Sequence, residues 1–208
     1  NQKPTENTNI SSIDVSEGVN ALAKQSLLLK KEIIITNQLL QLKNSDSVIT
    51  SSENDNNIEL LSKHCYSSQG IGTTDNPQFL QCFWEQGLII KGWVFFQTAA
   101  TSNNLISGYN TIFCWEAVDQ KYFEHIKKLK AVNRIGGGWQ AGSIAWGFKG
   151  FGVNVTSKKI ITLYSGEKFD TTTGIIVVKE EEKLLPIYAF LSSPNFTEEL
   201  LKIDQSLS

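Results

Sequence analysis

The chain has 208 residues, which is enough to bury a sizeable core in one domain or in two small ones. Its 40% hydrophobic and 10% aromatic residues exclude a disordered tail and predict a folded globular protein. A net charge of −2 argues against a uniformly basic nucleic-acid-binding protein. No apolar run reaches the roughly 18 residues of a membrane-spanning helix, and the polar residues 1–12 do not resemble a signal peptide. We therefore expect a cytoplasmic protein without membrane contact.

Two residue types bear on the origin and the chemistry of the chain. Methionine is absent, also from position 1, so we expect the chain to be a segment of a longer protein. The three cysteines, Cys65, Cys82 and Cys114, lie far apart and form no C-x-x-C pair. This spacing favours structural thiols packed as small hydrophobic side chains over a zinc site or a disulfide framework.

The first part of the chain predicts a helix, a strand and a linker. Asp14 or Ser16 is suited to cap a helix that runs to about residue 31. The apolar face of this helix comprises Val19, Leu22, Ala23 and Leu27. Residues 33–36 are β-branched and favour extended structure, whereas residues 44–57 are rich in Ser, Asn and Asp and are typical of a linker.

The sequence beyond this linker predicts an α+β fold. We divide the chain into an N-terminal helical arm and linker, residues 1–57, and a main domain, residues 58–208. Short strands are expected at residues 65–67, 79–85, 92–97, 111–115, 153–155, 160–164 and 175–178. Helices are expected at residues 119–130, where an apolar stripe faces lysines, and at 196–203. This alternation is typical of a mixed or mostly antiparallel sheet with flanking helices.

Charge is distributed unevenly along the chain. Residues 121–168 hold eight lysines and one arginine against two acidic residues, a net charge of +7. The segments before and after them carry net charges of −5 and −4. A basic middle of this kind concentrates phosphate contacts in one patch. The alternative is an ordinary solvated helix face at residues 121–130.

The residue types required for catalysis do not occur in a catalytic pattern. Neither His64 nor His125 adjoins a nucleophile motif such as G-x-S-x-G. Residues 136–152 contain seven glycines but lack the Gly-Lys-Ser/Thr ending of a phosphate-binding loop. Residues 76–79, Asn-Pro-Gln-Phe, lack the second proline of the motif with which adenine methyltransferases grip their base. We therefore expect no catalytic centre and no bound cofactor within the chain itself.

Three segments, in this order, resemble parts of one protein family. They read SSQGIGTTDNPQFLQCFWE (residues 67–85), AGSIAWGFKGFGVNV (residues 141–155) and LLPIYAFLSSPNFTEELLKID (residues 184–204). They are similar to segments of the large adenine-specific DNA methyltransferases of phage-defence systems, the BREX or phage-growth-limitation type, and of related single-chain restriction–modification enzymes. The resemblance covers about residues 58–208. Two departures are the segment FFQTAATSNNLISGYN, which replaces a Trp-Tyr loop, and Leu-Ser-Ser in place of Leu-Asn-Ser at residues 191–193.

The resemblance implies a target-recognition domain that binds double-stranded DNA. The catalytic domain of the parent enzyme, which uses S-adenosylmethionine to methylate an adenine swung out of the duplex, would then lie outside this chain. Base recognition requires polar side chains on loops, and phosphate recognition requires cations. The expected base-contacting residues are Gln69, Thr73, Thr74, Asn76 and Gln140, and the expected phosphate anchors are Arg134, Lys149, Lys158 and Lys159.

Other interpretations compete with this hypothesis. Gly70 and Gly72 fit an ordinary tight turn, Asn76 fits a cap, and Trp139 and Trp146 fit a hydrophobic core. At the level of function, the acidic flanks suit a protein-interaction or scaffold module of the same parent enzyme. An autonomous small-molecule enzyme would need a catalytic cluster assembled from residues that are distant in sequence.

Overall fold

A computed structural model of the chain describes residues 8–41, 60–87, 91–116, 120–134, 137–156 and 159–203. The backbone divides into two compact units, Asn1–Leu60 with Ser193–Ser208, and Leu61–Ser192. The expected division at residue 57 placed the C-terminal residues with the main domain, whereas in the structure they group with the N-terminal unit. No helix in the described ranges has both the length and the apolar character needed to span a membrane.

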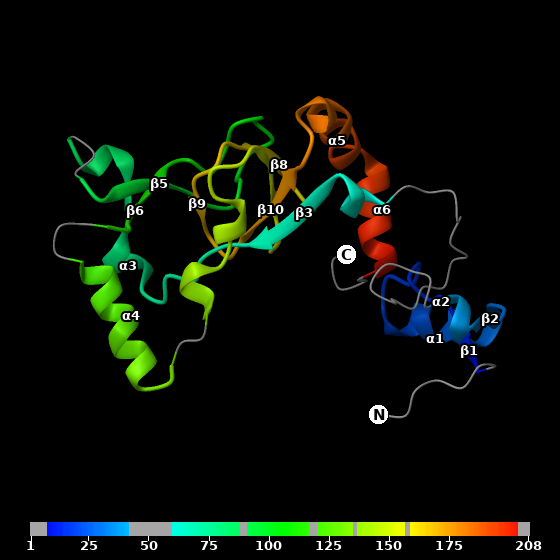
Figure 1. Cartoon of the computed structure of the whole chain (residues 1–208). Helices are drawn as coiled ribbons and strands as arrows, with labels where there is room; N and C mark the ends of the chain where they lie inside the picture. The colour runs from blue at the N-terminus through cyan, green and yellow to red at the C-terminus, as the bar shows by residue number, and fades with distance from the viewer. Residues whose placement is uncertain are drawn as a thin grey trace. The chain divides into compact units, whose positions relative to one another are not determined.

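The N-terminal unit contains a two-stranded antiparallel sheet (Figure 1). Strand β1 (Asn9–Ser12) pairs with β2 (Ile34–Asn37), and α1 (Ala21–Lys30) lies between them in the chain. Helix α2 (Gln38–Gln41) follows β2 directly, and α6 (Pro194–Ile203) belongs to the same unit. The expected linker at residues 44–57 lies outside the described residues.

Helix α1 is shorter than the sequence predicts, because a different residue caps it. The side chain of Asn20 accepts a hydrogen bond from the amide of Ala23, which makes Asn20 the N-cap. Asp14 instead accepts a hydrogen bond from the amide of Ser16, a local turn that stops short of a helix. The predicted caps were therefore wrong. The predicted apolar face is also not buried, since Val19 is 92% exposed.

The unit Leu61–Ser192 is built on two four-stranded sheets. The first is antiparallel throughout, in the order β3-β10-β7-β8. Its strands are β3 (Cys65–Gln69), β10 (Thr173–Val178), β7 (Gly150–Asn154) and β8 (Ile161–Tyr164). The central strand β10 alternates buried and half-buried side chains, with Thr173, Ile175 and Val177 buried. This period of two is what a strand requires when one face packs on the core.

The second sheet is mixed, in the order β4-β6-β5-β9. Its strands are β4 (Leu80–Cys82), β6 (Thr111–Cys114), β5 (Trp93–Gln97) and β9 (Lys168–Phe169). Strands β4, β6 and β5 pair antiparallel, and β9 joins β5 in parallel. Short helices α3 (Asn76–Phe79) and α4 (Lys121–Ala131) pack beside this sheet, where Phe79 meets Tyr122 edge to face at 5.1 Å.

The segment around β9 joins the two sheets. The amide of Asp170 donates to the carbonyl of Gln97 on β5, and the amide of Ile71 donates to the carbonyl of Phe169 at 2.7 Å. Ile71, just after β3, and Asp170 form a parallel bridge. Because β9 leads directly into β10, one short stretch of chain carries hydrogen bonds to both sheets and fixes them as a single unit.

Aromatic side chains form a large part of the core of this unit. Phe113 on β6 is fully buried and lies within 4.8 to 5.6 Å of the rings of Phe96, Trp115 and Tyr122. Tyr122 and Ile126 come from the predicted apolar stripe of α4, which is confirmed as the buried face of that helix. All three cysteines are free thiols, and Cys65 and Cys114 are buried.

The predicted α+β class is confirmed, with antiparallel and mixed sheets and flanking helices. The described elements that complete the unit are the 3-10 turns η2 (Leu61–Lys63), η3 (Phe83–Glu85), η4 (Gly137–Gln140), η5 (Ser143–Ala145) and η6 (Glu181–Lys183), and α5 (Leu184–Leu191). The sequence did not predict β1 or β9, because both are short and partly polar.

Candidate nucleic-acid interface

The structure brings together two of the segments on which the family resemblance rests, residues 67–85 and 141–155: the carbonyl oxygen of Gln69 lies 3.1 Å from where a Cβ atom on Gly142 would be. The amide of Gly72, in the loop after β3, donates to the carbonyl of Gly138 in η4 at 3.3 Å. On the preceding strand, the hydroxyl of Tyr66 donates to the carbonyl of Ile144 in η5 at 3.0 Å. The end of β3 and the loop after it therefore lie beside the glycine-rich turns η4 and η5, although about 70 residues of sequence separate them.

Within the loop after β3, Thr73 and Asn76 have different positions. Thr73 is only 2% exposed, and its hydroxyl donates to the side-chain oxygen of Asn76. Asn76 is exposed, at the start of α3, and Asp75 caps that helix by accepting from the amide of Gln78. Buried Thr73 thus fixes the loop from inside, whereas the amide of Asn76 faces solvent with its orientation set by Thr73.

Thr74 adopts a backbone conformation that few non-glycine residues occupy, with φ = +67°. Its exposed hydroxyl lies 2.9 Å from Nε2 of His125 on α4. The ring of His125 also packs against Phe79, with the ring centres 5.0 Å apart. Through these contacts α4 supports the loop, and the role of His125 is structural: it holds Thr74.

The remaining predicted base-contacting residues are also exposed. Gln69 ends β3 and Gln140 ends η4, and the side chains of both are exposed. Arg134 is exposed just beyond α4, where its amide donates to the carbonyl of Leu129 at 2.9 Å. Together with φ = +53° at Asn133, this bond ends α4 in a Schellman motif.

The structure does not gather the predicted lysine anchors into a patch of available cations. Lys149 forms an exposed ion pair with Glu181, with Nζ and Oε1 2.7 Å apart, and this hydrogen bond raises the pKa of Lys149. Lys159 donates to the carbonyl of Val155 at 3.2 Å. Lys158 lies outside the described residues. The two described lysines are therefore engaged within the protein.

Helix α4 carries lysines for which the sequence left two interpretations open, a phosphate-contacting patch and an ordinary solvated face. Lys121 and Lys128 lie one turn before and one turn after His125, so they share its side of the helix. Both are exposed. Lys127 is also exposed but points to the opposite side, two residues along from His125. His125 contacts Thr74 in the loop. Lys121 and Lys128 are therefore the lysines of α4 that lie on the side of the helix next to the loop.

The tryptophans of the glycine-rich segment belong to the core. Trp146 packs against Trp115 at 5.3 Å, and Lys168 lies over both rings, 4.3 Å and 4.6 Å from their centres. Burial lowers the pKa of Lys168, while Glu116 acts in the opposite direction. Trp139 packs against Phe123 on α4. These contacts hold η4 and η5 in place and favour the core interpretation of both tryptophans.

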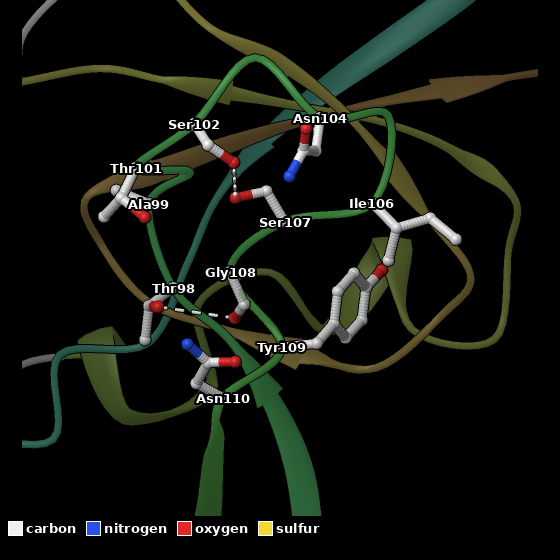
Figure 2. Close-up of a pocket in the computed structure, with 10 residues that line it drawn as sticks. All are labelled: Thr98, Ala99, Thr101, Ser102, Asn104, Ile106, Ser107, Gly108, Tyr109 and Asn110. Carbon is white, nitrogen blue, oxygen red and sulfur yellow. Dashed lines mark hydrogen bonds between the residues drawn. The ribbon is translucent and has the colours of Figure 1, made fainter.

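A cavity that the sequence did not predict lies in the polar loop between β5 and β6. It has a volume of about 300 Å³ and is lined by residues of the loop 98–110 (Figure 2). The loop closes on itself where the amide of Thr98 donates to the carbonyl of Gly108 at 2.9 Å. Gly108 has φ = +84°, and a Cβ atom there would lie 2.1 Å from the carbonyl oxygen of Thr98, so only glycine fits this closure.

Buried polar side chains of β8 and β5 hold the loop in place through hydrogen bonds. The hydroxyl of Thr162 accepts from the amide of Ser107 at 2.9 Å and donates to the carbonyl of Leu105 at 3.1 Å. The side-chain amide of Gln97, which is fully buried, donates to the carbonyl of Ser107 in the loop at 3.4 Å and to the carbonyl of Leu163 on β8 at 2.9 Å. These bonds are long-range, and they give an irregular loop a defined shape.

Removing the Thr162 hydroxyl is expected to loosen this loop. We predict that Thr162→Val lowers the free energy of unfolding by about 1–3 kcal/mol, because the amide of Ser107 and the carbonyl of Leu105 lose a buried partner. Chemical denaturation followed by tryptophan fluorescence measures the change. Thr101→Val, in the same loop but exposed, is the matched control and should stay within about 0.5 kcal/mol. Equal effects of the two substitutions would contradict the prediction.

No group of three or more metal-ligating side chains occurs among the residues that the structure describes. The chain matches no protein-family model, and no curated protein is significantly similar to it.

Proposed function

We propose that the chain is the DNA target-recognition segment of an adenine-specific DNA methyltransferase whose catalytic, S-adenosylmethionine-binding domain lies outside it. The observation that carries this proposal is the contact between the end of β3 and the turn that leads into η5. Two segments that resemble the same family, residues 67–85 and 141–155, meet there: the carbonyl oxygen of Gln69 lies 3.1 Å from where a Cβ atom on Gly142 would be. These segments and the adjoining η4 expose Gln69, Thr74, Asn76 and Gln140, whose amides and hydroxyl are the groups that read base edges.

The local backbone supports the same proposal. Thr74 is held at a positive φ by a histidine from another element, and Asn76 is oriented by a buried threonine. A conformation of this kind persists only when its surroundings fix it, and such positions cluster at binding sites. Side chains that are held before binding lose less conformational entropy when they meet the DNA.

Phosphate anchoring is assigned to Lys121 and Lys128 of α4, with Arg134 at the end of that helix. These cations lie on the helix that supports the loop. Lys149 forms an ion pair with Glu181, and Lys159 donates a hydrogen bond to a carbonyl. Cations that meet phosphates release counterions, so DNA affinity falls steeply with salt.

Fluorescence anisotropy with a mixed-sequence duplex tests the proposal. We expect binding at about 20 mM salt that is lost by about 200 mM, with the double variant Lys121→Ala/Lys128→Ala lowering the slope of log affinity against log salt by about 2. Lys127→Ala, on the opposite side of α4, is the control and should leave the slope unchanged. A folded chain that binds no duplex at low salt would refute the proposal.

One observation favours the alternative of a protein-interaction module. The N-terminal unit exposes several large apolar side chains, among them Val19, Leu22 and Leu29, and exposed apolar groups of this kind mark interaction sites. Under this alternative the folded chain has no DNA affinity at any salt concentration and is retained by the catalytic part of its parent protein. The same anisotropy experiment therefore separates the two functions.

A further inference from the structure

The cavity in the loop 98–110 is a preformed site built from uncharged polar groups. Hydrogen bonds from Thr162 and Gln97 fix its frame, as described above, so the loop does not need to order itself around a ligand. Its volume of about 300 Å³ is at the lower end for ligand sites, which suits a single ring system better than a large molecule.

Three polar side chains around the cavity have no hydrogen-bond partner within the described part of the chain: Thr101, Asn104 and Asn110. Asn104 lies in the middle of the loop and Asn110 at its end, and both side chains line the cavity (Figure 2). Each amide offers one donor and one acceptor side by side. Every described lining residue is uncharged, and groups of this kind pair with uncharged donor–acceptor edges rather than with phosphate or carboxylate.

Tyr109 adds a flat surface beside these amides. Its hydroxyl donates to the carbonyl of Leu163 at 3.0 Å, which holds the ring in one orientation at the cavity wall. Burial raises the pKa of this hydroxyl to about 12. Next to it, Ile106 supplies an apolar side chain that is 67% exposed. A ring and an aliphatic group beside paired amides suit a flat heterocycle with a hydrogen-bonding edge.

We propose that this cavity receives one nucleobase of the bound DNA and that Asn104 and Asn110 read its edge, a role that rests on the proposed function of the chain. Asparagine pairs with two atoms of adenine at once, so adenine is the favoured base. The cavity thereby adds a second recognition element, on the loop between β5 and β6, to the surface formed by the loop after β3 and η4.

Selection of binding sites from a randomised duplex library tests this proposal with the full chain. We expect the unsubstituted chain to enrich a sequence motif, and Asn104→Ala and Asn110→Ala to reduce the preference at one or two positions of that motif roughly 10- to 100-fold. The salt dependence of binding should stay unchanged, because the amides contact bases rather than phosphates. The control is Asn103→Ala, an exposed asparagine of the same loop outside the cavity lining, which should keep the motif.

The outcomes separate this inference from the function on which it rests. A chain that binds no duplex refutes both. A chain that enriches a motif which Asn104→Ala and Asn110→Ala leave intact retains the proposed function and refutes the base pocket. Variants that melt like the unsubstituted chain but bind every sequence equally more weakly, with a smaller salt slope, would assign the loop to the DNA backbone and also refute base reading. Variants that keep the salt dependence of binding but lose the base preference support the base pocket.

Discussion

Replacing Phe113 with alanine is expected to lower the free energy of unfolding by about 4 kcal/mol, within the range for truncation of a buried aromatic residue. Phe113 is fully buried and contacts the rings of Phe96, Trp115 and Tyr122. It therefore links β5, β6 and α4. The substitution removes contacts to three elements at once and leaves a cavity that rigid neighbouring rings cannot fill.

Tryptophan fluorescence during urea denaturation measures this effect in the relevant unit, since all five tryptophans lie within Leu61–Ser192. Phe148→Ala is the control: Phe148 is 54% exposed, so its truncation should change the free energy of unfolding by about 0.5 kcal/mol or less. If both variants unfolded at the same urea concentration, Phe113 would not be the centre of the core.

The sequence predicted those elements whose burial pattern is local. Helix α4 was identified because four apolar side chains recur at helical spacing, and β10 because its β-branched residues form one apolar run. The cap of α1 was missed, since Asp14, Ser16 and Asn20 are all suitable caps and only the fold selects among them. The periodicity of apolar residues predicted whether a segment is a helix or a strand. The residue at which a helix begins depended on which of several side chains caps it.

The candidate site was predictable in part. The loop after β3 was identified from its glycines and polar side chains, but its contact with η4 was not, because a hydrogen bond between Gly72 and Gly138 leaves no signal in either segment. The ion pair of Lys149 was hidden for the same reason: Glu181 is 32 residues further along the chain. Whether a lysine is available to a ligand depends on neighbours that only the tertiary structure supplies.

The loop 98–110 is the clearest case of a structure that could not be predicted from the sequence. Its sequence, rich in Ser, Thr and Asn, is typical of any surface loop. Its shape comes from Thr162, a residue more than 50 positions later, and from Gln97, a polar side chain at a buried position of β5. A buried polar residue next to an irregular loop is the one signal that could have drawn attention to it, because such residues are retained only where they satisfy other polar groups.

The second prediction concerns Gly70, the residue that joins β3 to the candidate recognition loop. A Cβ atom at this position would lie 2.2 Å from the carbonyl oxygen of Asp170 and 2.4 Å from that of Phe169. Both are backbone atoms, so neither can rotate away as the end of a side chain would. We expect Gly70→Ala to lower the free energy of unfolding by about 3 kcal/mol, at the upper end for overpacked positions.

We expect Gly70→Ala to weaken the hydrogen bonds next to the substitution more than those of the unit as a whole. This result would show that the segment connects the two sheets, because a purely steric clash would destabilise the whole unit evenly. The bonds from Ile71 to Phe169 and from Thr171 to Ile71 adjoin the clash, so hydrogen exchange at the Ile71 and Thr171 amides should accelerate more than exchange in β10. Gly87→Ala is the matched control, since no atom lies within 4 Å of the added methyl group, and it should leave stability within about 0.5 kcal/mol. If the folded Gly70→Ala variant also loses DNA affinity, the bridge between the sheets positions the recognition loop. Unchanged hydrogen exchange at the Ile71 amide would instead mean that the backbone shifts to make room for the added methyl group. The loop after β3 would then be held by η4 and α4 alone.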